Sequence, residues 1–360
     1  MNNIFNRLVW TIILCCTSVL IIGAKPSKGA KESERKKGHI IMFYNVENFF
    51  DIEDDPNTLD DEFTPEGPKE WSATKYEKKL SNISNVIYSV ASANKNFPAI
   101  IGMSEIENRR VLDDIVSSEH LFRANYQIVH YDSPEIRGVD VALLYRPDVF
   151  EFEWSDAFQP VIPERPGFKT RDILAVCGRI EGELFCFFVN HWSSRRGGSE
   201  ASEFLRCGAA QTLRNYTDSL QRLYPDINIV IMGDMNDDPF NKSLSEVLGA
   251  QKSIKKVKPN GFFNPFWEML EAGYGSIGYQ DAWSLFDNIV VNSNLTDVDS
   301  EGSMKIYKGA RDRYYGTVFK RKFLIQQKGK YKNYPLRTYS GNSFVGGYSD
   351  HLPVYIEVGK

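Results

Sequence analysis

The sequence lacks the residue patterns of several common classes of enzyme and scaffold. Only five of its 360 residues are cysteine, and two of these, Cys15 and Cys16, lie in an apolar run near the N-terminus. The odd number that remains argues against a disulfide scaffold. There is also no Cys/His spacing of a structural zinc site, no glycine-rich phosphate-binding loop and no serine in a nucleophile-elbow context. These absences argue against structural-zinc modules, nucleotide-cradling loops and serine-nucleophile hydrolysis.

The chain has little excess charge of either sign. Its formal net charge is −4, and no region stands out as strongly basic, so charge gives no support to a broad nucleic-acid-binding surface. This does not exclude a metal-dependent nuclease, because bound divalent cations supply positive charge locally. A hydrophobic fraction of 42% is enough for a large core.

The N-terminus has the composition of a targeting segment. Arg7 lies in a short polar head, an apolar run spans residues 8–22, and the small residue Ala24 offers a cleavage point. We therefore expect a signal peptide at 1–24, a charged flexible linker at 25–38 and one domain at 39–360. An uncleaved membrane anchor stays open as the alternative. Export to a periplasm or to the outside is the expected localisation, with no stable membrane span after cleavage and a monomeric state.

From residue 39 onward, strand-like and helix-like patterns are mixed. Apolar strand patterns occur at 39–46, 97–106, 125–131, 139–147, 150–154, 173–192, 227–236, 284–292 and 352–358, and helical patterns at 75–93 and 199–224. This order predicts two packed sheets with helices on their outer faces. The segments 251–278 and 311–342, rich in glycine, lysine and aromatic residues, are predicted to be long surface loops.

The stretch "ILAVCGRIEGELFCFFVNHW" predicts a β-hairpin that turns at Glu181-Gly182. A two-residue turn there places Cys177 opposite Cys186. An oxidising compartment would cross-link them. We favour the simpler interpretation, two small hydrophobic side chains on one sheet face.

Polar residues end or begin most of the apolar strands. Strand ends of packed sheets gather at one rim, so these groups are expected to share a cleft. They are Asn45, Glu105, His191, Asp234, Asn236, Asp287, Asp350 and His351. Carboxylate and amide oxygens suit Mg²⁺, Mn²⁺ or Ca²⁺, and imidazoles suit proton transfer near neutral pH. Together they suit hydrolysis of a phosphate ester.

The ordered motifs "FYNVENFFD", "GMSEIENR", "NHWSSR", "GDMNDDP", "FDNIVV" and "YSDHLP" give the sequence a family likeness. Over residues 39–360 it resembles the endonuclease/exonuclease/phosphatase superfamily of DNase I-like nucleases, abasic-site endonucleases, sphingomyelinases and inositol polyphosphate 5-phosphatases. The resemblance implies an α/β fold of four layers, with two packed mixed β-sheets flanked by helices. It also implies a divalent cation, Mg²⁺ or else Mn²⁺ or Ca²⁺.

The resemblance also implies roles for individual residues. Metal binding falls to Glu105, Asn45 and Asp350. Catalysis falls to His351, Asp287 as the acid that orients it, the water- and phosphate-orienting pair Asp234 and Asn236, and His191. Phosphate contacts are implied for Arg171 and, less directly, for Arg137. Abasic-site enzymes usually lack a histidine at the position of His191, which favours a nonspecific nuclease over DNA repair. Whether His351 or Asp234 is the base stays open.

Three features complicate this interpretation. Residues 51–62 insert an acidic loop that could repel phosphate or bind another cation, whereas Arg195 and Arg196 add positive charge beside His191. The stretch "GFFNPFWEML" is a weak candidate for a membrane-inserting hairpin. We expect an exported metal-dependent phosphodiesterase, first of all an endonuclease acting on nucleic acid. A phospholipid or inositol phosphate stays open as substrate, as does a catalytically silent binding module on the same fold.

Overall fold

Two mixed β-sheets form the centre of the fold in the computed structural model, which describes residues 38–279, 282–297, 301–309 and 313–360. The expected signal peptide and all but Gly38 of the expected linker lie outside these residues. Within the described residues no helix combines the length and apolar character needed to cross a membrane.

The first sheet carries the N- and C-terminal strands side by side at its centre. Its strand order is β14 (Lys305–Tyr307), β18 (Val354–Gly359), β1 (His39–Phe49), β2 (Ile100–Ile106), β4 (Asp140–Tyr145) and β3 (Gln127–His130), with β15 (Gly316–Val318) also paired to β18. β1 runs parallel to β2 and antiparallel to β18. The sheet is therefore mixed, as the sequence predicts.

The second sheet packs face to face on the first. Its order is β5 (Phe150–Phe158), β6 (Ile173–Ile180), β7 (Glu183–His191), β8 (Asn228–Asp234), β13 (Asp287–Asn292), β10 (Phe262–Phe263) and β9 (Ala250–Gln251). Gly102 of β2 marks the closest approach, because a Cβ there would collide with Met232 of β8. Large apolar side chains of both sheets, such as Phe43 and Phe187, fill the remaining space in one shared core.

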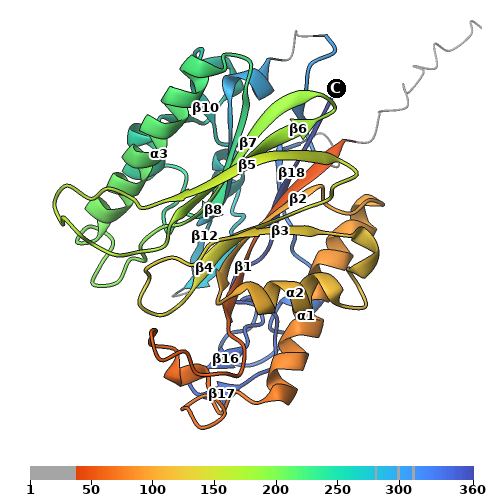
Figure 1. Ribbon diagram of the computed structural model, residues 1–360, viewed down its shortest axis with the longest axis vertical. Helices are drawn as coiled ribbons and strands as arrows, with labels where there is room; N and C mark the ends of the chain where they lie inside the picture. Colours follow the sequence, from red (N-terminus) through yellow and green to blue (C-terminus); the bar gives the residue numbers. More distant parts are fainter. Residues whose placement is uncertain (1–37, 280–281, 298–300, 310–312) are drawn as a thin grey trace, which may run out of the picture. The chain divides into compact units, whose positions relative to one another are not determined.

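Helices cover the outer face of each sheet (Figure 1). α1 (Ala73–Asn94) buries Ile83, Ile87 and Val90 at helical spacing against the first sheet's core and ends where Lys95 adopts a left-handed conformation. α3 (Glu203–Leu223) buries Ala209, Leu213 and Leu220 in a second core, on the outer face of the second sheet. The result is the predicted four-layer sandwich.

The structure adds short elements that the sequence analysis does not predict. α2 (Arg109–Ser117) is an amphipathic helix whose first turn is capped by the Asn108 side chain, which accepts a hydrogen bond from the amide of Val111. α4 (Trp267–Glu271) and β16 (Tyr339–Ser340) lie in the segments predicted as surface loops, and the hairpin partners β11 (Ile277–Tyr279) with β12 (Ala282–Ser284) and β17 (Ser343–Phe344) lie at or just beyond the ends of these segments.

The prediction of long surface loops at 251–278 and 311–342 is therefore wrong in part. Phe262 and Phe266 are fully buried, and Leu324 and Tyr339 are nearly so. Burial of each such side chain contributes roughly 1.5–3 kcal/mol, which holds these segments on the core. Most apolar residues of "GFFNPFWEML" thus pack on the core, and the segment contains the short helix α4 in place of a membrane-inserting hairpin.

The predicted cysteine hairpin is present, but its cysteines are not reduced. Ile180 pairs with Glu183 and Cys177 with Cys186, and Glu181 and Gly182 both have the positive φ angles of a tight turn. Cys177 and Cys186 form a buried disulfide between adjacent strands. The preference for two unlinked side chains was wrong, because the register brings the two Cα atoms to 4.1 Å, where cross-linking is sterically possible.

The disulfide should stabilise the domain by restricting the unfolded chain. Its closed loop is short, with a sequence separation of 9, for which loop-closure entropy gives roughly 2–3 kcal/mol. We expect the Cys177→Ala/Cys186→Ala variant to lose about that much in urea unfolding followed by circular dichroism. With a strong reductant present, the wild type should fall to the same midpoint. Equal midpoints without reductant would show that the bond adds no stability.

Candidate active site

The polar residues that end the strands meet at one edge of the two sheets. Register places His191 of β7 beside Asp234 of β8, and Asp234 beside Asp287 of β13. From the first sheet, Asn45 of β1 donates a 3.0 Å hydrogen bond to Asp234 Oδ2. We call this edge the catalytic rim, defined by Asn45, Glu105, His191, Asp234, Asn236, Asp287, Asp350 and His351.

Asn45 occupies the centre of the catalytic rim and is fully buried. Its amide nitrogen also donates to Glu105 Oε1 at 3.2 Å, so one amide bridges two carboxylates. Its amide oxygen accepts a hydrogen bond from the backbone of Glu47. Asn45 thereby positions the carboxylate of Glu105, and its own oxygen is turned toward the backbone.

The backbone around these residues is held in an uncommon conformation. The β1–β2 register shifts between Asn45 and Phe49, and Glu47, Asn48 and Glu105 have φ angles of 55°, 46° and 62°. Non-glycine residues adopt this region at a cost of about 1 kcal/mol or more. The conformation directs the Asn48 amide to Glu105 Oε2 at 2.8 Å. Such outliers cluster at functional sites.

His351 and Asp287 form a buried pair. His351 Nδ1 lies 2.7 Å from Asp287 Oδ2, and Nε2 faces Asp234 Oδ2 at 3.7 Å. Burial alone would lower the pKa of His351, but Asp287 and Asp234 outweigh it and raise that pKa well above its usual value. The two carboxylates therefore favour the imidazolium form of His351.

Asp234 lies between two imidazoles. Its Oδ2 is 3.7 Å from His351 Nε2 and 3.8 Å from His191 Nε2. Burial raises the pKa of Asp234 to about 7, although the charge of His351 acts against the increase. A carboxylate that titrates near neutral pH is suited to accept a proton during the reaction.

His191 is held as a neutral imidazole. Burial, followed by the charges of Arg171, Arg137 and His351, lowers its pKa well below the usual value. Nε2 faces Glu105 Oε1 at 3.7 Å as well as Asp234, whereas Nδ1 is buried without a hydrogen-bond partner. We assign the proton to Nε2 because that atom faces two carboxylates.

Asn236 follows the end of β8 in a left-handed conformation with φ 49°. Its backbone amide donates to Asp234 Oδ1, and its side-chain amide donates to the carbonyl of Trp192, both at 3.0 Å. Two arginines fix the loop that follows: Arg195 donates to the Asn236 carbonyl, and the buried Arg206 of α3 pairs with Asp237. Arg195 thus holds the loop after β8 in place, in addition to adding positive charge near His191.

Arg171 and Arg137 are linked through one glutamate. The buried Arg171 donates to the carbonyls of His191 and Trp192 and lies 3.6 Å from Glu135 Oε1. Arg137 is half-exposed and pairs with the same oxygen at 3.1 Å. Arg171 therefore holds the strand end that carries His191. Phosphate contact stays a prediction for both arginines, and Arg137 is the more accessible of the two.

Asp350, which the sequence analysis predicted, lies beside three charged residues that it did not predict: Glu47, Lys79 and Arg337. Burial opposes ionisation of Asp350, but His351 and Arg337 lower its pKa. Arg337 hydrogen-bonds Asp350 and lies 3.7 Å from Glu47 Oε1. Burial raises the pKa of Glu47 to about 7 and lowers that of Lys79 to about 8. Glu47 could have been found, because it lies within the motif "FYNVENFFD"; Arg337 and Lys79 carry no sequence signal.

The donor set of the catalytic rim fits a hard divalent cation. Carboxylate oxygens of Glu105 and Asp234 lie within 4.8 Å of each other, and Asp350 adds a third carboxylate on the same rim. Oxygen-rich sets of this kind suit Mg²⁺ or Mn²⁺.

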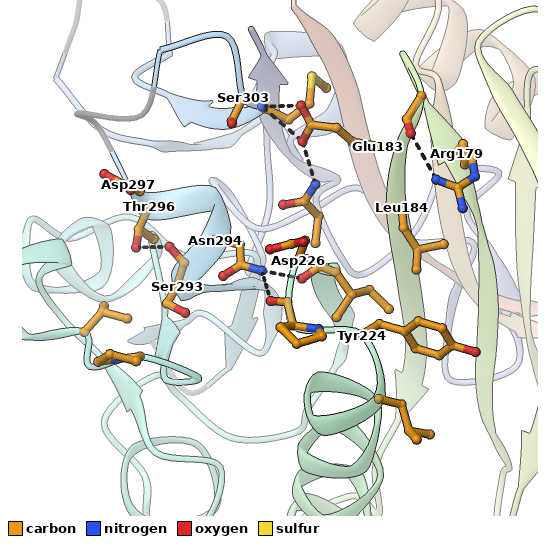
Figure 2. A pocket seen from close by; sticks show the side chains of 18 of the residues that line it. Arg179, Glu183, Leu184, Tyr224, Asp226, Ser293, Asn294, Thr296, Asp297 and Ser303 are labelled. Atoms are coloured by element: carbon orange, nitrogen blue, oxygen red, sulfur yellow. Dashed lines mark hydrogen bonds between the residues drawn. The ribbon is translucent and has the colours of Figure 1, made fainter.

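A large groove lies away from this chemistry. It encloses about 1010 Å³ between the β6–β7 turn and the C-terminal end of α3 (Figure 2). Asn228, which begins β8, lines it, whereas the catalytic Asp234 ends that strand. Its polar groups are largely bonded to one another, as where Asn228 donates to Glu183. The small catalytic rim, and not this groove, carries the reactive groups.

A profile of the Endonuclease/Exonuclease/phosphatase family matches residues 40–360. The chain belongs to this family. No curated protein matches the sequence. The match begins one residue after the start of β1 and covers the whole catalytic rim, so the family likeness and the geometry concern the same residues.

Solved structures share the fold at low identity. D. rerio TDP2 complexed with a single-strand DNA product is 12% identical, with a TM-score of 0.51 over 89% of this chain and 99% of that one. The catalytic domain of human Nocturnin with bound sulfate is 14% identical (TM-score 0.51, 90% and 94% covered). A Bacteroides thetaiotaomicron mannosyl-6-phosphatase is 16% identical (TM-score 0.50, 89% and 100% covered). These likenesses confirm the DNase I-like fold alone.

Replacing Asp287 removes the negative charge that stabilises the protonated form of His351. Asp287→Asn keeps the shape of the side chain but should lower the pKa of His351 in an NMR titration. Because the folded pKa is raised, the pair stabilises the wild type at low pH, and this stabilisation is lost as pH rises through the folded pKa. We expect Asp287→Asn to be about 3–5 kcal/mol less stable below that pKa.

The matched control is Asp140→Asn, which changes a buried acid that accepts hydrogen bonds from Ser133 outside the catalytic rim. This variant should leave the His351 titration in place. An unchanged His351 pKa in Asp287→Asn would refute the assignment of the imidazolium.

Proposed function

We propose that the protein is a divalent-metal-dependent phosphodiesterase that acts as an endonuclease on nucleic acid. The observation that carries the proposal is the position of Asp234, a carboxylate with a pKa near 7 held between the imidazolium of His351 and the neutral imidazole of His191. A base of intermediate pKa beside a fixed cation is the combination that hydrolysis of a phosphate ester needs.

Asp234 is assigned as the group that accepts a proton from the attacking water. Asn45 and the backbone amide of Asn236 donate hydrogen bonds to the two oxygens of Asp234, so the orientation of this carboxylate is fixed before the reaction. His351 cannot serve as the base while it is protonated. Its raised pKa therefore assigns the proton transfer to Asp234.

His351 is assigned to the developing negative charge on the phosphate. Nδ1 is engaged with Asp287, which leaves Nε2–H to donate to a phosphoryl oxygen. His191, with its proton on Nε2, supplies a neutral donor on the other side of Asp234. A bound Mg²⁺ or Mn²⁺ would neutralise phosphate charge and polarise the phosphorus centre; Glu105, with Asp350 and Asn45 in support, is the group that would hold it.

Several observations support a soluble polyanion over a membrane lipid as substrate. The three phenylalanines of "GFFNPFWEML" are buried and Trp267 is half-buried, so this segment exposes little apolar surface to a membrane. The TDP2 relative was solved with single-strand DNA product, although at 12% identity this lends support through the fold only. All residues that the catalytic reading requires are present, which makes the silent binding module the weaker alternative.

We also propose that the protein is exported and acts as a monomer. The apolar segment at residues 8–22 supports export, and so does the Cys177–Cys186 disulfide, because such bonds persist in oxidising compartments. Secretion fits a nonspecific nuclease better than an intracellular repair enzyme.

Glu105→Gln should abolish metal-dependent turnover of bis-p-nitrophenyl phosphate and leave the circular dichroism spectrum unchanged. His191→Ala and His351→Ala should each reduce kcat by on the order of 10²-fold or more. The control Glu151→Gln changes an exposed acid on β5 and should retain full activity. A fully active Glu105→Gln would contradict the metal assignment, and a fully active His351→Ala the mechanism.

A substrate panel separates the remaining candidates: plasmid DNA, RNA, sphingomyelin, inositol phosphates and mannose 6-phosphate, each with Mg²⁺, Mn²⁺, Ca²⁺ or EDTA. Cleavage of plasmid or RNA that EDTA abolishes is the expected result. Turnover of a lipid or a phosphomonoester with intact nucleic acid would overturn the nuclease assignment. Binding of metal without any turnover would favour the silent module.

A further inference from the structure

One surface segment is far more basic than the chain as a whole. Between residues 313 and 349 the sequence has no aspartate or glutamate, although the full chain is acidic overall with a net charge of −4. We call residues 320–337 the basic hairpin. Its cations are all exposed: Lys320, Arg321, Lys322, Lys328, Lys330, Lys332 and Arg337. The sequence-based statement that no region is strongly basic was therefore wrong.

The basic hairpin is anchored to the domain. Ile325 pairs with Pro335 in an isolated bridge, the amide of Gln326 bonds the carbonyl of Tyr334, and that of Leu336 bonds the carbonyl of Leu324. Leu324 and Ile325 are 2% and 7% exposed. The cations thus project from a segment whose apolar side chains face the core, and their separation is set by the fold.

Direct contacts place the basic hairpin beside the catalytic rim. Arg337 hydrogen-bonds Asp350, and the amide of Tyr348 bonds the carbonyl of Leu336. The neighbouring β11 is joined to the rim as well, since Ile277 pairs with His351. In Figure 1, β16, which follows the hairpin directly in sequence, lies at the end of the sandwich toward which β1 runs.

Aromatic rings are interleaved with the cations on this surface. Phe323 and Tyr331 are 36% and 46% exposed, and Tyr279 of β11 is 71% exposed. Trp283 of β12 lies under Lys320, whose Nζ is 3.8 Å from the ring centroid, and edge-on to Tyr334. Exposed rings between cations are the combination that binds unpaired bases and their phosphates.

Resting on the proposed function, we infer that the basic hairpin, together with Tyr279 and Trp283, binds a single-stranded nucleic acid and leads it to the catalytic rim. The phosphates pair with the exposed lysines and arginines, and the bases stack on the exposed rings. In a duplex the faces of the bases are stacked on one another, so a duplex can bind this surface only through its phosphates. The hairpin also offsets the acidic loop at residues 51–62, which had counted against a polyanionic substrate.

The test is a charge reversal at the tip of the basic hairpin with a charge-matched control. Lys328→Glu/Lys330→Glu/Lys332→Glu changes the net charge by −6. Lys255→Glu/Lys256→Glu/Lys258→Glu makes the same change at three exposed lysines around Ile254 and Val257, which line the groove of Figure 2. Fluorescence anisotropy of a labelled single-stranded oligonucleotide in EDTA, over a series of salt concentrations, measures affinity for the full chain without cleavage.

We expect the hairpin triple variant to bind at least about tenfold more weakly and to lower the salt slope by about 2, since each lost phosphate contact on a single strand removes about 0.7. The control triple variant should bind nearly as the wild type does. Tyr331→Ala, which keeps the charge, should weaken binding about fivefold or more. Equal affinity in both triple variants would overturn the inference.

Two further readouts separate this inference from the proposed function. Turnover of bis-p-nitrophenyl phosphate with Mg²⁺ should be the same in the wild type and the hairpin triple variant, because this small diester does not reach the hairpin. If the wild type shows no turnover but the hairpin triple variant still binds the oligonucleotide more weakly, the proposed function is refuted and the inferred binding surface is supported. The same variants are tested for binding to duplex DNA and to vesicles containing phosphatidylserine. If either ligand loses as much affinity as the single strand does in the hairpin triple variant and in Tyr331→Ala, the choice of ligand is overturned.

Discussion

The catalytic rim depends on one amide group that joins the two sheets. Asn45 belongs to the first sheet, yet its Nδ2 bonds both Glu105 beside it and Asp234 of the second sheet. Two carboxylates brought this close would repel each other in a buried site, and a shared neutral donor reduces that cost without adding a charge. Because the donor comes from a strand, the spacing of the carboxylates is set by how the sheets pack. This arrangement requires Glu47 and Asn48 to adopt left-handed backbone conformations, which are unfavourable for residues other than glycine.

A second constraint is the charge balance beneath the rim. Asp237, Glu47 and Asp287 are buried acids, and each has a cation close by: Arg206 at 2.8 Å, Arg337 at 3.7 Å and His351 at 2.7 Å respectively. The charge of the buried Lys79 also lowers the pKa of Glu47. Unpaired, any of these acids would be strongly destabilising in the core. The pairs therefore hold the rim in one geometry before substrate arrives, which is what electrostatic stabilisation of a transition state requires. Arg206 and Lys79 come from α3 and α1, so the outer layers of the sandwich also take part in positioning the rim.

Sequence reasoning succeeded where a residue's neighbours are fixed by strand order. Asn45, Glu105, His191, Asp234, Asp287 and His351 could all be placed on one rim, because ends of packed strands meet whatever the intervening loops do. It failed where the partner comes from far along the chain. Nothing in the sequence near Lys79 indicates that its ammonium bonds Thr338 and the Tyr348 carbonyl. Arg171 was predicted to contact phosphate, whereas the structure shows it bonded to the His191 and Trp192 carbonyls. The basic hairpin was missed for another reason: averaged over a chain with 47 acids, its cations leave no excess, and only the acid-free run from 313 to 349 reveals them.

The division between strands and insertions explains how relatives so similar in fold can differ in substrate. The rim residues sit on β1, β2, β7 and β13, at and just after the end of β8, and ahead of β18, where packing leaves little freedom, so their relative positions follow from the fold. In the surface that we propose, substrate recognition falls to segments that the core does not dictate, which are the β11–β12 hairpin and the residues between β15 and β18. Both contact the neighbourhood of His351 directly, through Ile277 and Arg337. A phosphate approaching His351 from the side of these segments therefore meets aromatic rings and positive charge before it reaches the reactive groups.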